Sequence, residues 1–132
     1  MRFSKNHRAK TTTVDGIKFA SLGEARRYQE LKLLKQAHVI KDFKMQPEFE
    51  LIPAYKDEYG KTVRKSKYVG DFLVYYPDGR IICEDVKGDI LTPEFKQKWK
   101  QFGLNLIEGK YSEQYPNLLR EIVKMTGKRA KC

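Results

Sequence analysis

The sequence predicts a single α/β domain, in which a mixed β-sheet is flanked by helices in the order α-β-β-β-α-β-α. Three observations support this fold class. The 132 residues fit one compact domain with a core of its own. Stretches in which apolar residues alternate with polar ones are interleaved with stretches that carry apolar residues at helical spacing. Residues 14–132 contain no internal repeat, low-complexity tract or linker, so we expect one domain there.

Residues 1–13 are polar and basic, and almost none of their side chains can join a core. We expect a flexible N-terminal arm that reaches a nucleic-acid partner through its positive charges. The alternative is charge that only keeps the chain in solution. The basic residues of this arm are Arg2, Lys5, Arg8 and Lys10.

A helix is predicted from Ser21 to about Ala37. Ser21 and Glu24 have the spacing of a capping box, in which both side chains bond back to the backbone at the helix N-terminus. We expect the apolar face of this helix to pack against the sheet. That face consists of Ala25, Tyr28, Leu31 and Leu34.

Two strands are predicted between this helix and residue 68. The first spans residues 43–51, where apolar and polar residues alternate. Pro47 favours an edge strand or a bulge, because proline cannot donate a backbone hydrogen bond to a neighbouring strand. Residues 56–60 predict a turn, and we expect a basic strand from Thr62 to Tyr68 after it.

A β-hairpin follows. Val69 to Tyr76 predicts one strand, residues 77–79 a tight turn, and Arg80 to Lys87 the returning strand. Side chains alternate between the two faces of a strand. One face of the returning strand therefore carries Ile81, Cys83, Asp85 and Lys87, and the other carries Ile82, Glu84 and Val86.

The remaining elements are predicted as a helix, a strand and a last helix. Thr92 and Pro93 have the character of an N-cap and a first helical residue. Leu104 to Ile107 predicts a short apolar strand. Residues 118–125 carry apolar side chains at helical spacing before Gly127, which predicts a C-terminal helix.

The charge of the chain favours a polyanionic partner. Lys and Arg total 27 against 17 Asp and Glu, which gives a formal net charge of +10. A structural nucleic-acid binder would share this balance, so charge alone does not indicate catalysis. The helix after Pro93 carries three lysines that either form a solvated face or contact phosphate, namely Lys96, Lys98 and Lys100.

Several classes of site and location are disfavoured. His7 and His38 form no ligand pattern with the two cysteines, so we expect neither a zinc site nor a histidine-based triad. No apolar run approaches the ~20 residues needed to cross a bilayer, and no apolar signal segment is expected near the N-terminus. We therefore expect a cytoplasmic protein with reduced thiols and no membrane partner.

Asp71 and the triplet Asp85-Val86-Lys87 form the candidate site. Asp85 and Lys87 share one face at the end of a strand, roughly 6–7 Å apart along the backbone, and Asp71 lies on the partner strand of the hairpin. Two converging carboxylates repel each other unless a divalent cation lies between them. Oxygen ligands select a hard ion such as Mg²⁺ or Mn²⁺, which polarises phosphoryl oxygens and acidifies water. With Lys87 orienting that water, the site suits phosphodiester hydrolysis.

The motif Gly70-Asp71, thirteen residues, then Asp85-Val86-Lys87 resembles the PD-(D/E)xK nuclease signature, with Glu24 as the upstream helical glutamate. Gly70 replaces the proline of the signature, a position that does no chemistry. More narrowly, residues 68–72 and 84–88 look like small phage and prophage proteins related to endonuclease I-type Holliday-junction resolvases. The resemblance covers about residues 14–107 and implies a restriction-endonuclease-like core.

This resemblance implies a Mg²⁺-dependent DNA endonuclease, with residues 14–132 as its nuclease domain and Mn²⁺ able to substitute. Asp71 and Asp85 would hold the metal, with the Val86 carbonyl as a further ligand. Lys87 would handle the attacking water, and Glu24 would complete the site. Four-way junctions are the implied substrate, and symmetric cutting of a junction needs a homodimer. The implied location is the host-cell cytosol if the chain is phage-encoded.

Other interpretations stay open. The spacing from Ser21 gives Glu24 a purely structural role as a helix cap. Glu84 points away from Asp85 and is expected to be a surface or helix-contacting acid rather than a metal ligand. The protein could also be a phage nuclease for flapped, linear or single-stranded DNA. A basic nucleic-acid-binding recombination accessory protein without catalysis is the alternative from another class.

Overall fold

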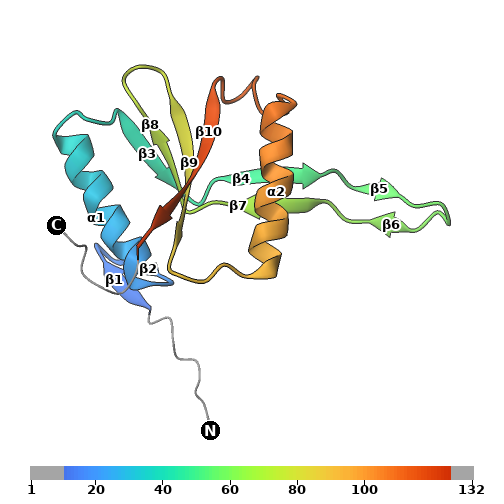
Figure 1. Ribbon diagram of the computed structural model, residues 1–132, viewed down its shortest axis with the longest axis horizontal. Helices are drawn as coiled ribbons and strands as arrows, with labels where there is room; N and C mark the ends of the chain where they lie inside the picture. The colour runs from blue at the N-terminus through green and yellow to red at the C-terminus, as the bar shows by residue number, and fades with distance from the viewer. Residues whose placement is uncertain (1–10, 126–132) are drawn as a thin grey trace, which may run out of the picture.

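The computed structural model describes residues 11–125, which form a central sheet with one helix on each face (Figure 1). Helix α1, Leu22–Gln36, covers one face, and helix α2, Pro93–Ile107, covers the other. The predicted mixed α/β architecture with flanking helices is confirmed. Neither helix in this part of the chain is long and apolar enough to cross a membrane.

The central sheet has four strands in the order β10-β9-β8-β3. Its strands are β3 (Asp42–Met45), β8 (Phe72–Tyr75), β9 (Ile81–Lys87) and β10 (Leu118–Lys124). Strand β8 pairs antiparallel with both β3 and β9, and Phe72 lies opposite Glu84. Strand β10 runs parallel to β9, with Leu118 opposite Ile81. The chain reaches β10 through α2, because a parallel pair needs a crossover connection.

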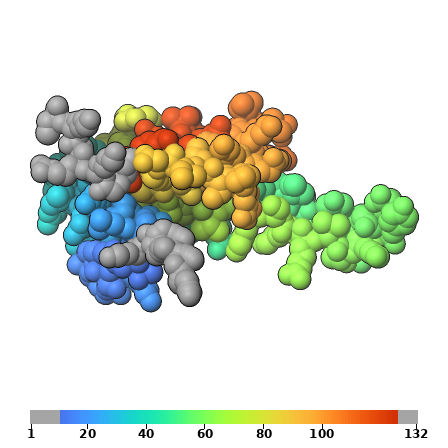
Figure 2. Space-filling model, turned by 60° about the horizontal axis from the view of Figure 1, so that its bottom comes forward, coloured from blue at the N-terminus to red at the C-terminus, as the bar shows by residue number. Residues whose placement is uncertain are grey.

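The other strands form three two-stranded ribbons. These ribbons pair β1 (Thr12–Val14) with β2 (Ile17–Phe19), β4 (Glu48–Ile52) with β7 (Ser66–Val69), and β5 (Tyr55–Lys56) with β6 (Thr62–Val63). The last two ribbons follow one another along a single long hairpin that extends past α2 (Figure 1). The end of this hairpin projects from the body of the protein (Figure 2). We call residues 53–65, beyond the β4–β7 pairing, the β-arm.

Two apolar clusters hold the helices to the sheet. On the α1 side, Leu31 packs with Phe72 and Val86. On the α2 side, Phe102 packs with Cys83. Each buried aliphatic or aromatic side chain of this kind contributes about 1.5–3 kcal/mol to folding. Cys83 and Val86 of β9 therefore enter opposite clusters, which agrees with the two faces predicted for this strand.

Both helices begin at the predicted residues. Ser21 is the N-cap of α1, and its hydroxyl accepts a hydrogen bond from the Glu24 N–H at 3.2 Å. Thr92 caps α2 in the same way through the N–H of Phe95 at 3.1 Å. The predicted turn before β9 is confirmed, with Gly79 at a φ of 96°, a conformation that favours glycine.

The C-terminal elements differ from their prediction. Leu104 to Ile107, expected as a strand, is the last turn of α2. Residues 118–124, expected in a helix, form strand β10. A short apolar stretch fits both periodicities, and the parallel pairing with β9 decides between them. Ile122 joins the cluster under α2 and Val123 joins the cluster under α1, as successive residues of a strand do.

The expected strands before β8 are also interrupted. Residues 43–51 form two strands rather than one, because Pro47 and Gln46, with its φ of 53°, lie between β3 and β4. The basic strand expected from Thr62 to Tyr68 is split into β6 and β7. Thr12 and the next residue, at the end of the predicted N-terminal arm, belong to β1. The four basic residues predicted to contact DNA from that arm, Arg2, Lys5, Arg8 and Lys10, lie outside the described residues.

Candidate active site

The candidate site lies where α1, β8 and β9 meet. Glu24 is in the first turn of α1, Asp71 directly precedes β8, and Asp85 and Lys87 are at the end of β9. The structure places all four predicted residues in this region, but on two openings: Glu24 and Asp71 line one, and Asp85 and Lys87 line the other. The charges of Asp85, Glu24 and Lys87 all act on the Asp71 carboxyl, and those of Asp85 and Lys87 also act on Glu24.

Asp71 is held by the backbone of β9. Its N–H donates to the Glu84 carbonyl at 2.9 Å, and its Oδ2 accepts from the Val86 N–H at 2.7 Å. The hairpin pairing thus continues one residue before β8 begins. This bonding fixes the Asp71 carboxylate beside the last residues of β9.

Gly70 explains why the predicted strand Val69–Tyr76 is interrupted. Strand β7 ends at Val69 and β8 begins at Phe72, with the chain turning between them. The Gly70 N–H donates to the Pro47 carbonyl at 2.9 Å. A Cβ at position 70 would meet the Cys83 sulfur at 2.6 Å, so glycine is required for this close approach.

The charges around Asp71 disfavour its ionised form. Burial raises the pKa of Asp71 to about 7, and the negative charges of Asp85 and Glu24 add to this effect. The Val86 N–H and the Lys87 ammonium act in the opposite direction but do not compensate. Burial likewise raises the pKa of the Glu24 carboxyl above its ordinary value. The site therefore holds more negative charge than its own cation balances.

The Asp85 carboxylate has one partner on each oxygen. Its Oδ1 forms an ion pair with Lys87 Nζ at 3.0 Å, and its Oδ2 accepts a hydrogen bond from the Tyr68 hydroxyl at 2.5 Å. Burial raises the pKa of Tyr68 far above its ordinary range, so the hydroxyl stays a donor. The Lys87 ammonium also lies 4.2 Å from the centre of the Phe95 ring, a cation–π contact that helps to hold it.

The Val86 carbonyl faces the same side as Asp71. The N–H and C=O of one strand residue point to the same neighbouring strand. The Val86 N–H donates to Asp71, whereas the carbonyl of Lys87, the next residue, accepts from the Met125 N–H on the side of β10. The Val86 carbonyl therefore lies on the side of the Asp71 carboxylate.

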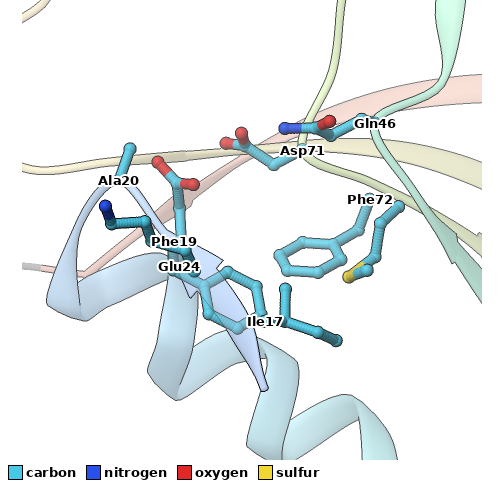
Figure 3. Close-up of a pocket in the computed structure, with 9 residues that line it drawn as sticks. Ile17, Phe19, Ala20, Glu24, Gln46, Asp71 and Phe72 are labelled. Atoms are coloured by element: carbon cyan, nitrogen blue, oxygen red, sulfur yellow. The ribbon is translucent and has the colours of Figure 1, made fainter. Parts of the chain in front are cut away.

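A cavity of about 210 Å³ opens beside Asp71 and Glu24. The two carboxylates point toward each other across it, and Gln46 lies next to Asp71 (Figure 3). This volume holds several water molecules at ~30 Å³ each, which is the space a hydrated cation needs.

Glu24 combines a capping position with an available carboxylate. Its backbone N–H makes the capping bond to Ser21, while its side chain accepts a long hydrogen bond of 3.4 Å from the Ser21 hydroxyl. The carboxylate of Glu24 points into the cavity (Figure 3). The Ser21 half of the predicted capping box is confirmed, whereas the Glu24 carboxylate contacts the Ser21 hydroxyl and not the Ser21 backbone.

A second hollow lies on the α2 side of Asp85. Its lining includes Lys87, Lys98 and Lys67, so three cations surround this opening. Lys98 is also paired with Glu94 at 3.6 Å. The other two lysines predicted to contact DNA from α2, Lys96 and Lys100, are exposed on the helix and line neither this hollow nor the cavity.

Glu84 is a helix-contacting acid, as predicted. Its fully buried carboxylate accepts two hydrogen bonds from Arg27 of α1, at 2.8 and 2.6 Å. This bidentate pair lies on the α1 face of the sheet, while the neighbouring Asp85 interacts with Tyr68 and Lys87. The two adjacent acids of β9 therefore have separate partners.

A family described as "Protein of unknown function (DUF1064)" matches residues 4–127 of this chain. The chain belongs to the DUF1064 family. The match includes both helices, the whole central sheet, the β-arm and all four candidate residues of the DUF1064 protein. No curated protein and no solved structure matches the chain.

The sequence assigns no role to three residues that lie at or beside the site of this DUF1064 protein. The alternation along its strand places Tyr68 on the buried face. A buried tyrosine hydroxyl needs a hydrogen-bond partner, and this requirement could have indicated the contact with Asp85. Arg27 could have been inferred from Glu84, because a buried acid needs a cation. Nothing in the sequence places Gln46 beside Asp71.

The oxygen ligands of the DUF1064 site suit a hard cation. Among residues 11–125, no three His, Cys, Asp or Glu side chains are arranged to hold a metal ion by themselves. Two carboxylates and one backbone carbonyl are nevertheless a suitable set for Mg²⁺, which binds one or two carboxylates and keeps other positions for water and phosphate. The excess negative charge at Asp71 supports this fit.

Proposed function

We propose that this DUF1064 protein is a Mg²⁺-dependent DNA endonuclease with a restriction-endonuclease-like core. One observation carries the proposal. The Val86 N–H holds the Asp71 carboxylate at 2.7 Å beside the end of β9, which also carries Asp85 and Lys87. Glu24 lies across the cavity from Asp71. The four residues of the nuclease-like motif therefore lie around the end of β9, with Glu24 and Asp71 on one opening and Asp85 and Lys87 on the next, which supports the proposal.

The order of elements supports the proposed core. Helix α1, strands β3, β8 and β9, helix α2 and strand β10 follow one another as helix, meander, helix and strand. That order is the one implied by the PD-(D/E)xK resemblance. The long hairpin is an insertion between β3 and β8, and residues 118–124, expected as a helix, supply the last strand of this core.

The residues of the chain have distinct proposed roles. Asp71, Asp85 and the Val86 carbonyl hold Mg²⁺, or Mn²⁺ in its place. When bound, the ion supplies the positive charge that polarises a phosphoryl oxygen and acidifies a water molecule. Lys87 Nζ, held by Asp85 and Phe95, donates a hydrogen bond to the attacking water or to the phosphate. The Glu24 carboxylate accepts a hydrogen bond from water in the cavity.

The substrate and assembly follow from the resemblance and the charge. The net charge of +10 supports nucleic acid as the partner. The motif resemblance favours DNA, with four-way junctions as the preferred form, and the cytosol of a phage-infected host as the location. Symmetric cutting of a junction requires two active sites, so the proposed working form is a homodimer.

A comparison of three DNA forms tests this proposal. A four-way junction, a flap and a plain duplex of equal arm length are incubated with the protein and Mg²⁺, and with EDTA as the control. We expect the junction to be cut fastest and EDTA to stop cutting. Equal cutting of the duplex contradicts the junction preference. Binding without cutting of any form favours a recombination accessory protein instead.

A further inference from the structure

The β-arm projects beyond the body of the protein and has a defined shape (Figures 1 and 2). At its tip, Asp57 Oδ1 accepts hydrogen bonds from the N–H groups of Tyr59 and Lys61, both at 2.9 Å. The N–H of Asp57 donates back to the Lys61 carbonyl at 2.9 Å, and Gly60 adopts a φ of 79°. The tip is therefore a closed turn, so little ordering entropy is lost when a partner binds it.

The β-arm is basic, and its positive charges are available. Its 13 residues contain four Lys or Arg and two Asp or Glu. Asp57 is occupied by the turn. Within residues 11–125, no carboxylate lies at ion-pair distance from Lys61, Arg64 or Lys65. All three side chains belong to exposed residues.

This basic ribbon is continuous with the candidate site. Strand β7 leads from Ser66 directly to Lys67, which lines the hollow that also contains Lys87 and Lys98. Asp85 lines the same hollow. Lysine and arginine side chains therefore follow one another from the candidate site to the end of the β-arm. Those of the hollow are paired, Lys67 with Glu48 at 3.1 Å, Lys87 with Asp85 and Lys98 with Glu94.

We propose that the β-arm is a DNA-binding arm that contacts the phosphate backbone of the same DNA molecule whose cleaved strand enters the site. This inference rests on the proposed function for the choice of DNA as the polyanion. Lys61, Arg64 and Lys65 bind phosphates at a distance from the cleavage point and so orient the DNA across the site. The contacts are to the backbone and carry no base sequence information.

The charge of the β-arm favours DNA over a second copy of the chain. Interfaces between protein copies are depleted in lysine, and two identical arms would bring like charges together. The apolar residues that would form an interface core are sparse here, because Tyr55 and Tyr59 are the large exposed ones of the β-arm. Phosphate backbones match the exposed cations without that cost.

The test compares two triple variants that remove the same charge. The arm variant is Lys61→Gln, Arg64→Gln and Lys65→Gln. The matched control variant is Arg26→Gln, Lys41→Gln and Lys44→Gln, three exposed cations outside the β-arm with no carboxylate at ion-pair distance among residues 11–125. Binding to a four-way junction is measured in EDTA over a range of salt concentrations, so that cleavage does not interfere.

We expect the arm variant to bind the junction at least ~10-fold more weakly than the control variant. Its plot of log affinity against log salt should be shallower by about 2–3, since each lost phosphate contact removes ~0.9. Equal affinity and slope for the two variants would overturn the proposal. A change of oligomeric state confined to the arm variant, seen in sedimentation with no DNA present, would also overturn it.

Cleavage in Mg²⁺ separates this inference from the proposed function. If the wild-type protein cuts the junction and the arm variant binds and cuts as well, the β-arm proposal fails and the nuclease proposal stands. If the wild-type protein never cuts the junction, but the arm variant binds it more weakly than the wild type, the nuclease proposal fails and the β-arm remains a DNA contact.

Discussion

Asp71 and Val86 are joined by a 2.7 Å hydrogen bond from the Val86 N–H to Asp71 Oδ2, and Asp71 is the residue just before β8. This bond brings the carboxylate of one strand to the end of the next. It also places Asp71 within the electrostatic reach of Asp85 and Glu24. The stability, metal binding and activity of the protein should all depend on this arrangement.

The first prediction concerns pH and the stability of the metal-free protein. The folded pKa of Asp71 is about 7 against an ordinary value of 3.8, so the folded state binds a proton more tightly than the unfolded state. Stability should therefore fall as pH rises from about 4 to about 7. Asp71→Asn removes the charge and should stabilise the protein at pH 8 by up to about 4 kcal/mol, since each of the three pKa units corresponds to about 1.4 kcal/mol, with little effect at pH 4.

Thermal unfolding in EDTA at both pH values measures this effect. A variant that is less stable than the wild type at pH 8 would contradict it. When Mg²⁺ replaces EDTA at pH 8, the Tm of the wild type should rise because the ion binds only the folded state. The Asp71→Asn variant should show a smaller rise, whereas Glu113→Gln, an exposed acid elsewhere, should respond like the wild type.

The second prediction separates the two roles of Glu24. Glu24→Gln keeps the backbone capping bond and removes the carboxylate that points into the cavity, so the junction cleavage rate should fall about 10–100-fold. Ser21→Ala removes the cap and should lower stability by about 1 kcal/mol while cleavage continues. Rate measurements below the unfolding temperature of each variant check both outcomes. Full activity in Glu24→Gln would leave this residue as a cap alone.

The third prediction makes Tyr68 a positioning residue for Asp85. Tyr68→Phe keeps the ring, which lies 4.8 Å from the Phe102 ring, and removes the hydrogen bond to Asp85 Oδ2. The loss should cost about 1 kcal/mol of stability. We also expect a change in the Mg²⁺ concentration needed for half-maximal cleavage, because the Asp85 carboxylate can rotate. An unchanged Mg²⁺ requirement, with only the stability lowered, would reduce Tyr68 to a packing residue.

The fourth prediction concerns the buried pair between Arg27 and Glu84. Arg27→Met leaves the Glu84 charge buried without its partner and should destabilise the protein by about 3 kcal/mol. Glu84→Gln combined with Arg27→Met should cost less than the two single changes together. Denaturant unfolding checks this result. The control is Glu108→Gln, which breaks the exposed pair with Lys110 and should lower the free energy of unfolding by less than about 0.5 kcal/mol. Equal costs for Arg27→Met and Glu108→Gln would contradict it.

Local signals allowed the hairpin, and the faces on which its acidic residues lie, to be predicted from the sequence. The alternation along β9 assigned Asp85 and Glu84 to opposite faces, and the structure confirms this through Tyr68 and Arg27. The caps at Ser21 and Thr92 likewise depend on residues a few positions away. Such features are encoded within one element and its turn, so the residue pattern is sufficient.

Features that depend on distant pairing could not be predicted in the same way. Residues 118–124 have apolar residues that fit a helix or a strand, and only the neighbouring β9 selects the strand. Tyr68, whose hydroxyl bonds Asp85, comes from β7, and β7 is positioned by its pairing with β4, the strand after Pro47. The β-arm could not be foreseen either, because the basic residues after Gly60 indicate a strand but not its projection from the fold.

Junction cleavage by the wild type and by Asp85→Asn tests the central claim most directly. Asparagine keeps the size of the side chain but removes the charge that Mg²⁺ and Lys87 require. We predict Mg²⁺-dependent cutting by the wild type, loss of at least ~100-fold of that rate in Asp85→Asn, and unchanged junction binding. Cutting at the wild-type rate by Asp85→Asn would contradict the assignment of this site.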